Sequence, residues 1–263
     1  TLQREILKTK GISFVPTMGA LHKGHISLIK KSKKSRLKTL VSIFVNPKQF
    51  HKKRDFRTYP RKKTQDTKLL KKLRIDYLYI PTSKDIYGFK PKNKIFLDKS
   101  SKKLCGKFRK GHFEGVLNVV NRFIEIIKPK YIYLGKKDYQ QLFLIKKHIE
   151  KRKIKSRIIE CETIRENNGV ACSSRNSKLN KNQIEVASNI HNYLRNLKKK
   201  IRKNYNLFNI NKIRIDLINL GANKIDYVEN YNIKSFKRII KTNKKFNLFF
   251  AYYIKNIRLI DNI

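Results

Sequence analysis

The sequence has few of the residues that mark secreted, membrane-bound or metal-binding proteins. It holds only three cysteines in 263 residues, far apart and without a Cys-x-x-Cys pair, which argues against a disulfide scaffold and a zinc ribbon. No apolar run approaches the roughly 18 residues of a membrane span, and the N-terminus lacks the layout of a signal peptide. We therefore expect a cytoplasmic protein with no membrane partner.

Acidic residues are also scarce, with 18 Asp and Glu against 65 Lys and Arg, a formal net charge of +47. Such an excess usually indicates a nucleic-acid or anionic-membrane partner. Here the lysines are spread over nearly every segment, beside abundant Asn, Ile, Tyr and Phe and no Trp, as a general compositional bias would produce. We expect only sequence-independent, salt-sensitive adhesion to RNA or DNA and no specific nucleic-acid partner.

What the chain does have is a turn between an apolar run and a helical pattern at residues 14–25. The apolar run at 12–15 ends in Pro-Thr-Met-Gly, and helical spacing resumes at 26–34. Gly19 and Gly24 let a ligand approach the backbone, and a helix start offers unpaired N–H groups to an anion. His22 and His25, three residues apart, would project from one helix face toward that anion. The alternative to an anion-binding site is that these are two surface histidines that happen to flank a glycine. The His-x-Gly-His pattern resembles the nucleotide-binding signature of nucleotidylyltransferases and class I aminoacyl-tRNA synthetases.

The rest of the chain alternates strand-like and helix-like segments. A continuous apolar, β-branched run at 39–45 and further strand-like segments at 75–80, 131–134 and 154–160 alternate with helical patterns that include 64–73 and 114–127. Irregular segments are predicted at 55–61 and 81–113. This alternation predicts an α/β fold, a Rossmann-like parallel sheet with flanking helices, over residues 1–176. A capping-box pattern at Asn180 and Gln183 begins a smaller C-terminal α+β domain at 177–263, expected to close the site.

Polar residues follow two further predicted strands, at the sheet edge where α/β proteins bind ligands. Asn46 and Gln49 lie in a Pro-containing turn after the run at 39–45, although Asn-Pro turns are often purely structural. After Gly135, Lys137 can reach a phosphate and Asp138 can accept from a ribose hydroxyl. The alternative is that this segment is an ordinary connection between a strand and a helix with an acidic first turn. Gln141, one turn on, can face a second substrate, and the polar loop at 162–176 supplies hydroxyl and guanidinium donors in its Ser-Ser-Arg run.

A single acidic residue falls in the helix predicted at 64–73. Asp66 is expected on the polar side, opposite Leu69, Leu70 and Leu73. It is either a surface partner of the surrounding lysines or, near a triphosphate, a ligand that helps to hold Mg²⁺.

Five ordered motifs together resemble the pantothenate synthetase family over almost the whole chain. They are Pro-Thr-Met-Gly-Ala-Leu-His-Lys-Gly-His (16–25), Ser-Ile-Phe-Val-Asn-Pro-Lys-Gln-Phe (42–50), Tyr-Pro-Arg (59–61), Gly-Lys-Lys-Asp-Tyr-Gln-Gln (135–141) and Ser-Ser-Arg-Asn (173–176). The Arg-Leu-Ile-Asp-Asn run at 258–262 is similar to the family's ending.

The resemblance implies an ATP- and Mg²⁺-dependent homodimer that condenses pantoate with β-alanine through pantoyl adenylate, releasing diphosphate and then AMP. It implies catalytic roles for His25 as proton donor, His22 and Lys137, and a metal-holding role for Asp66. Pantoate would be bound by Gln49, Gln141 and Asn46, and Gln49 would also border β-alanine. The implied ATP-binding residues are Met18, Gly19, Ala20, Leu21, His22, Lys23, Gly24, His25, Gly135, Lys136, Lys137, Asp138, Ile164, Cys172, Ser173, Ser174 and Arg175.

The chain departs from the family pattern at four positions. Lys136 stands where Glu is frequent, Cys172 replaces Met or Leu, Cys105 replaces an acidic residue, and Asp66 is one acidic residue where two are frequent. Two other functions remain open: a nucleotidylyltransferase that releases a dinucleotide, and a basic nucleic-acid-binding module without catalysis. The paired Gln49 and Gln141 favour a small hydroxy acid over the first, and the lack of a recognised binding motif disfavours the second.

Overall fold

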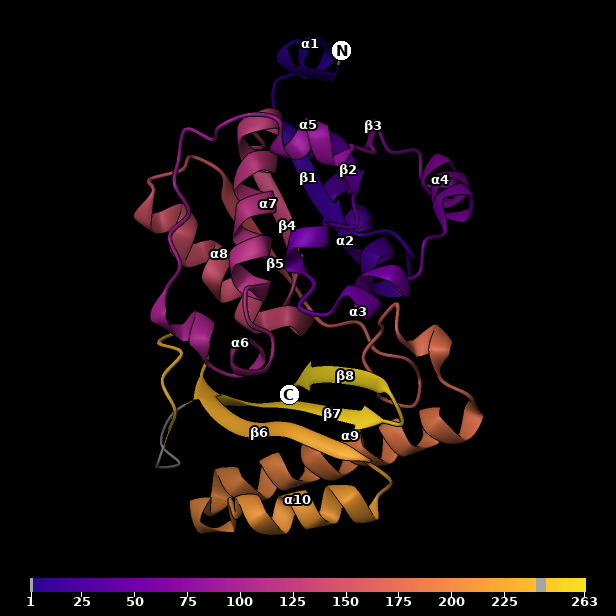
Figure 1. Ribbon diagram of the computed structural model, residues 1–263, viewed down its shortest axis with the longest axis vertical. Helices are drawn as coiled ribbons and strands as arrows, with labels where there is room; N and C mark the ends of the chain where they lie inside the picture. The colour runs from indigo at the N-terminus through magenta and orange to yellow at the C-terminus, as the bar shows by residue number, and fades with distance from the viewer. Residues whose placement is uncertain (1, 240–244) are drawn as a thin grey trace. The chain divides into compact units, whose positions relative to one another are not determined.

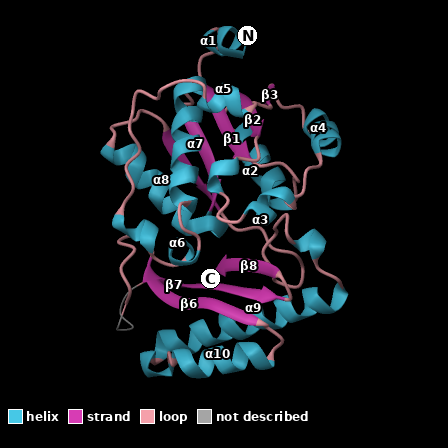
Figure 2. Cartoon of the chain, viewed as in Figure 1, coloured by secondary structure: helices cyan, strands magenta, loops and turns pink. Residues whose placement is uncertain are grey.

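The computed structural model describes residues 2–239 and 245–263, which fall into two compact units, Thr1–Thr163 and Ile164–Ile263 (Figure 1). The sequence predicted a domain boundary after residue 176, and that boundary stays a prediction. Figure 2 shows helices on a strand core in the first unit, and a small sheet with helices in the second. None of the helices in the described ranges is both long enough and apolar enough to cross a membrane.

The first unit is built on a five-stranded parallel sheet, which confirms the predicted Rossmann-like fold. Its strands are β1 (Ile12–Thr17), β2 (Lys38–Ile43), β3 (Tyr77–Tyr79), β4 (Tyr131–Gly135) and β5 (Arg157–Cys161), in the order β3-β2-β1-β4-β5. Ser13 pairs with Thr39 of β2 on one side and with Tyr131 of β4 on the other. Because β1 has β2 and β4 as neighbours, the direction of winding reverses there, and ligands bind beyond the carboxyl ends of strands at such a point.

Helices cover both faces of this sheet. On one face, α2 (Lys23–Lys33) and α4 (Lys63–Lys72) place Ile29 and Leu70 against Val15 and Val41 of the strands. On the other, Phe123 of α7 (His112–Ile127) packs on Phe14, Phe44 and Tyr79, with α8 (Tyr139–Lys151) beside α7 in Figure 1. Burial on both faces explains why the three inner strands β1, β2 and β4 are mostly apolar, whereas the edge strands β3 and β5 are only partly buried.

Short helices occupy segments that the sequence analysis predicted as loops. Residues 53–57 form α3 (Lys53–Arg57), and the segment 81–113 contains α5 (Ser83–Tyr87), the 3₁₀ turn η2 (Lys99–Lys102) and α6 (Cys105–Phe108). The helix α5 begins at a capping box in which Thr82 and Asp85 satisfy each other's backbone N–H groups. These predictions were wrong because helices of one turn are too short to show periodicity. The remaining helices of the unit are α1 (Leu2–Leu7), η1 (Pro47–Gln49) and η3 (Lys136–Asp138).

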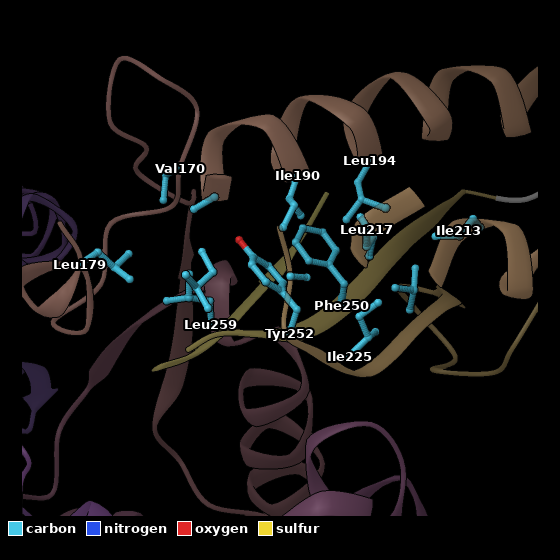
Figure 3. Packing of buried hydrophobic residues seen from close by; sticks show 14 residues of the cluster. Val170, Leu179, Ile190, Leu194, Ile213, Leu217, Ile225, Phe250, Tyr252 and Leu259 are labelled. Atoms are coloured by element: carbon cyan, nitrogen blue, oxygen red, sulfur yellow. The ribbon is translucent and has the colours of Figure 1, made fainter. Parts of the chain in front are cut away.

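The second unit has an antiparallel sheet of β6 (Lys224–Asn232), β7 (Phe246–Ile254) and β8 (Ile257–Asn262), in that order. The helices α9 (Lys181–Lys203) and α10 (Ile210–Asn219) contribute Ile190, Leu194 and Leu217 to an apolar cluster with Phe250 and Tyr252 of β7 (Figure 3). The capping box predicted for α9 is confirmed. Short 3₁₀ turns, η4 (Asn176–Lys178) and η5 (Tyr205–Leu207), complete this α+β unit.

Candidate active site

The turn after β1 leaves the sheet abruptly. The Thr17 hydroxyl donates to the carbonyl of Ser42 at 2.7 Å and accepts from the N–H of Gly19 at 3.2 Å, which ties the end of β1 to β2. Gly19 and Ala20 then have φ angles of 77° and 49°, both in the left-handed region. A non-glycine residue there costs about 1–2 kcal/mol, so the surrounding contacts must hold this turn in place.

His22 is the extended N-cap of α2 and His25 lies in its first turn, with their ring centroids 4.0 Å apart. The rings lie together as predicted, although His22 is not on the helix itself. The N–H groups predicted to be unpaired are partly taken by the imidazoles themselves, since His22 Nδ1 accepts from Gly24 at 3.1 Å. His25 Nδ1 likewise accepts from the N–H of His22 at 3.4 Å. Because Nδ1 accepts in both rings, the neutral tautomers carry their proton on Nε2. The histidines, rather than bare helix amides, therefore supply N–H donors at this end of the helix.

The electrostatics of His25 connect the turns after β1 and β4. Its pKa is lowered to about 3, chiefly by removal of the ring from water and further by His22 and Lys137, while Asp138 opposes the shift. The ring is therefore neutral near pH 7 and acts as a hydrogen-bond donor rather than as a cation. Lys137 and Asp138 follow a different strand, so the fold brings together two motifs more than a hundred residues apart.

The turn after β2 holds two buried amides. Asn46 Nδ2 donates to Gln49 Oε1 at 3.2 Å and to the carbonyl of Gly115 at 3.1 Å. Gln49 Nε2 in turn approaches the Met18 sulfur at 2.7 Å, which joins this turn to the one after β1. A thioether is a weak acceptor, so an oxygen of a ligand would be a better partner for that amide.

Three residues that the sequence analysis did not single out as ligand contacts support this turn. The Tyr87 hydroxyl donates to Asn46 Oδ1 at 2.7 Å, and His112 Nδ1 lies 2.7 Å from the carbonyl of Gln49. A Cβ on Gly115 would lie 2.2 Å from the carbonyl oxygen of Lys48, so only glycine lets α7 approach here. A glycine inside an otherwise apolar helical pattern was the one available signal in the sequence.

The segment after β4 begins with the short turn η3, and α8 starts at Tyr139, so a helix follows Gly135 as predicted but the charged residues 136–138 precede it. Lys137 pairs with Asp138 at 3.5 Å, and Lys136 pairs with Glu162. Gln141 is half-buried on α8, whereas its neighbour Gln140 is committed to the protein, because its amide bonds the backbone at Cys105, Ser100 and Lys103. Of this adjacent pair, only Gln141 stays a candidate for substrate contact.

Asp66 is not on a polar surface, which corrects the sequence analysis. It is 3 % exposed, and its two carboxylate oxygens accept the N–H groups of Ala20 at 2.8 Å and Leu21 at 2.9 Å. Helical periodicity placed this residue opposite the leucines, but the turn after β1 covers that side of α4. We call the turns that follow β1, β2 and β4, at residues 17–25, 46–49 and 135–141, the strand-end cluster. Asp66 contacts the first of these turns, the one that leads to His22 and His25.

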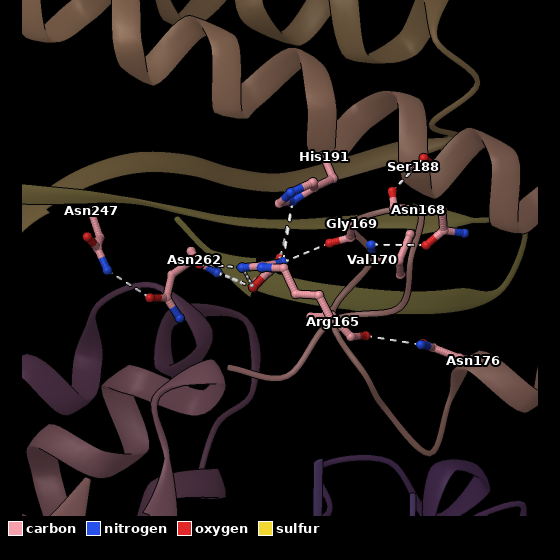
Figure 4. Close-up of polar contacts among 11 residues, drawn as sticks. Arg165, Asn168, Gly169, Val170, Asn176, Ser188, His191, Asn247 and Asn262 are labelled. Carbon is pink, nitrogen blue, oxygen red and sulfur yellow. Dashed lines mark hydrogen bonds and ion pairs between the residues drawn. The ribbon is translucent and has the colours of Figure 1, made fainter. Parts of the chain in front are cut away.

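Ile164 and residues 172–175 belong to the second unit, in a polar loop that folds back on itself. The N–H of Cys172 donates to the carbonyl of Ile164 at 2.9 Å, and Arg165 pairs with Ala171 in a β-bridge. Arg165 also binds the carboxylate of Asp261 and the carbonyls of Gly169 and Asn262, beside His191 (Figure 4). Burial alone would raise the pKa of Asp261, but hydrogen bonds from His191 and Arg165 hold it below its usual value. The Arg-Leu-Ile-Asp-Asn run thus anchors the base of the loop.

In the first unit, a parallel sheet carries a His-x-Gly-His turn after β1 and polar turns after β2 and β4, all at one edge. This arrangement defines a nucleotide-binding α/β enzyme fold. The chain belongs to the pantoate–beta-alanine ligase family, whose model matches residues 1–263.

Relatives and solved structures agree with this family. A pantothenate synthetase from Francisella tularensis subsp. mediasiatica is 39% identical over 268 residues, covering 100% of this chain and 92% of the relative. A crystal structure of the Francisella tularensis pantoate–beta-alanine ligase, complexed with beta-gamma ATP and beta-alanine, matches with a TM-score of 0.80 at 39% identity, over 96% of this chain and 89% of that one. A Thermus thermophilus pantothenate synthetase matches with a TM-score of 0.89 at 26% identity, over 99% and 96%.

Proposed function

We propose that the protein condenses pantoate with β-alanine through pantoyl adenylate at the strand-end cluster of the first unit. Membership of the ligase family supports the overall ATP-dependent reaction. The observation that carries the proposed site is that the turns after β1, β2 and β4 come together. Lys137 and Asp138 influence the pKa of His25 electrostatically, and Gln49 Nε2 contacts the sulfur of Met18.

In the first step, a carboxylate oxygen of pantoate attacks the α-phosphorus of ATP, and the bond from that phosphorus to the bridging oxygen of diphosphate breaks. Negative charge grows on the phosphoryl oxygens and on diphosphate, so the protein must supply positive charge and hydrogen-bond donors rather than a nucleophile. Lys137 supplies the charge, and the Nε2–H groups of His22 and His25 supply the donors. Because the pKa of the His25 imidazolium is lowered to about 3, the ring is neutral at pH 7 and keeps a single N–H, which donates a hydrogen bond.

In the second step, the amine of β-alanine attacks the acyl carbon of the adenylate. The carbon–oxygen bond to phosphate breaks, AMP leaves with one oxygen that came from pantoate, and the new amide nitrogen loses a proton to solvent. We assign Gln49 and Gln141 to the polar groups of pantoate, with Gln49 also bordering β-alanine. Asn46 already has partners on both amide atoms, so we assign it the orientation of Gln49.

Magnesium accompanies ATP in many phosphoryl-transfer enzymes, but Asp66 does not fit the ligand role. Asp66 is 3 % exposed and each of its oxygens already accepts a backbone N–H group, which leaves little room for a hydrated ion. Residues 2–239 and 245–263 also contain no group of three His, Cys, Asp or Glu side chains suited to a metal ion. Mg²⁺ keeps several water ligands and is commonly held through substrate phosphates. We therefore propose that any Mg²⁺ arrives with ATP and is held mainly by its phosphates.

Further assignments rest on the family resemblance. They are ATP contacts by residues 18–25, 135–138, 164 and 172–175, a homodimeric state and a cytoplasmic location. We also propose that the protein, despite its net charge of +47, has no specific nucleic-acid partner.

Product analysis tests the proposed function. With ATP, pantoate and β-alanine, we expect pantothenate, AMP and diphosphate in equal amounts, and no turnover when either pantoate or β-alanine is omitted. A dinucleotide product, or AMP formation that needs neither acid nor amine, would show a different activity.

A further inference from the structure

A buried carboxylate holds the turn that leads into the His-x-Gly-His helix. Asp66 sits in the first turn of α4, and its side chain reaches 46 residues back along the chain to Ala20. The two bonds, 2.8 Å to Ala20 and 2.9 Å to Leu21, use one carboxylate oxygen each. Hydrogen bonds from N–H groups to a charged carboxylate are roughly twice as strong as neutral ones.

The carboxylate binds the part of the turn whose backbone is strained. Gly19 and Ala20 have positive φ angles, and a Cβ on Gly19 would lie 3.0 Å from Asp66 Oδ2 and 3.1 Å from a methyl carbon of Ile43. The backbone of the turn therefore packs closely against Asp66 of α4 on one side and Ile43 of β2 on the other. His22, the N-cap of α2, comes directly after Leu21, so the position of the carboxylate sets where α2 begins.

The direction of these bonds also decides which groups can face a ligand. The N–H groups of Ala20 and Leu21 point to α4, and that of Gly24 points to His22 Nδ1. These three amides are already used within the protein. An anion would instead meet the imidazole Nε2–H groups and the Lys137 ammonium, and the placement of the two imidazoles depends on the turn that Asp66 holds.

We propose that Asp66 is a positioning residue that clamps the Gly19–Leu21 turn and so places His22 and His25, and that it is not a ligand for Mg²⁺. The consequence for activity rests on the proposed function, whereas the clamp itself can be measured without any substrate.

The first experiment is amide hydrogen exchange on the wild-type protein. Without nucleotide, the amides of Ala20 and Leu21 should exchange slowly, and neither Mg²⁺ nor a chelator should change their rates. Fast exchange of both amides, or release of their protection when Mg²⁺ is added alone, would overturn the clamp.

The second experiment compares Asp66→Asn with Asp76→Asn. The first substitution would keep the shape of the side chain but turn an NH₂ group toward one of the two backbone donors. Asp76 is a suitable control because it also accepts a backbone N–H, from Thr39 at 2.8 Å, but at the amino end of β2, far from the strand-end cluster. The clamp predicts faster exchange at Ala20 and Leu21 in Asp66→Asn alone.

Activity and its magnesium dependence separate the two roles. In Asp66→Asn we expect kcat to fall by at least about 10-fold, because a small displacement of catalytic groups is costly, with the half-saturating Mg²⁺ concentration unchanged. Asp76→Asn should keep near-wild-type kcat. A raised half-saturating Mg²⁺ concentration with recovery of kcat at excess Mg²⁺, or unchanged activity in Asp66→Asn, would overturn the positioning role. If no ligase activity were found in the wild type, the proposed function would fail while the exchange result still decided the clamp.

Discussion

His25→Ala should lower pantoate-dependent diphosphate release by roughly 10³-fold while the protein stays folded, because one donor aimed at developing charge is worth two to three orders of magnitude in rate. The residue contributes little to the hydrophobic core: it is not among the buried apolar residues, and its ring contacts His22 and accepts the N–H of His22 at 3.4 Å. Steady-state diphosphate release measures the rate, and thermal unfolding followed by circular dichroism checks the fold.

Two amide variants show which nitrogen of His25 matters. Asn places its amide near the position of Nδ1, and Gln places its amide near Nε2. If the Nε2–H is the functional donor, His25→Gln should recover part of the lost rate and His25→Asn should recover none. Near-wild-type turnover in His25→Ala would remove His25 from the mechanism, and a better rate in the Asn variant would mean that the cap bond to His22 is what matters.

The second large effect distinguishes Lys137 from Gln49. Lys137→Ala removes a charge that is needed mostly in the transition state, so kcat should fall by about 10²-fold or more while the pantoate KM changes little. Gln49→Ala leaves polar groups of pantoate unpaired, which costs roughly 1–3 kcal/mol and should raise the pantoate KM about 5- to 150-fold. Initial rates over a grid of ATP and pantoate concentrations give both parameters.

Matched variants control this comparison. Lys137→Arg keeps the charge and should recover part of kcat, and Gln65→Ala, at an exposed glutamine of α4, should behave as wild type. The ATP KM should barely change in Gln49→Ala. If that variant weakened ATP binding while pantoate saturation stayed normal, the assignment of the Asn46–Gln49 turn to the acid would be wrong.

The sequence was informative wherever the signal was local. Continuous apolar runs predicted the parallel strands, and each polar turn that follows β1, β2 and β4 could be placed at one sheet edge because parallel strands share an orientation. The rings of His22 and His25 lie together as predicted, but His22 does so as the extended N-cap of α2 and not from a helix face.

Contacts between segments far apart in the sequence could not be predicted from local patterns. Asp66 was predicted on a polar surface because its partners, Ala20 and Leu21, are more than 40 residues away and are backbone groups with no sequence signature. The support of Asn46 by Tyr87 comes from a one-turn helix in a segment predicted to be irregular. Capping of α2 by histidine was missed for a different reason, since Ser, Thr, Asp and Asn are the usual N-cap residues.

The adenylate route is tested most directly by following oxygen from pantoate. Pantoate labelled with oxygen-18 in its carboxylate is incubated with enzyme, ATP and β-alanine, and the AMP and diphosphate are analysed by mass spectrometry. Attack of the carboxylate on the α-phosphorus predicts one heavy oxygen in each AMP and none in diphosphate. Unlabelled AMP, with the heavy oxygen found in diphosphate or inorganic phosphate, would contradict the mechanism.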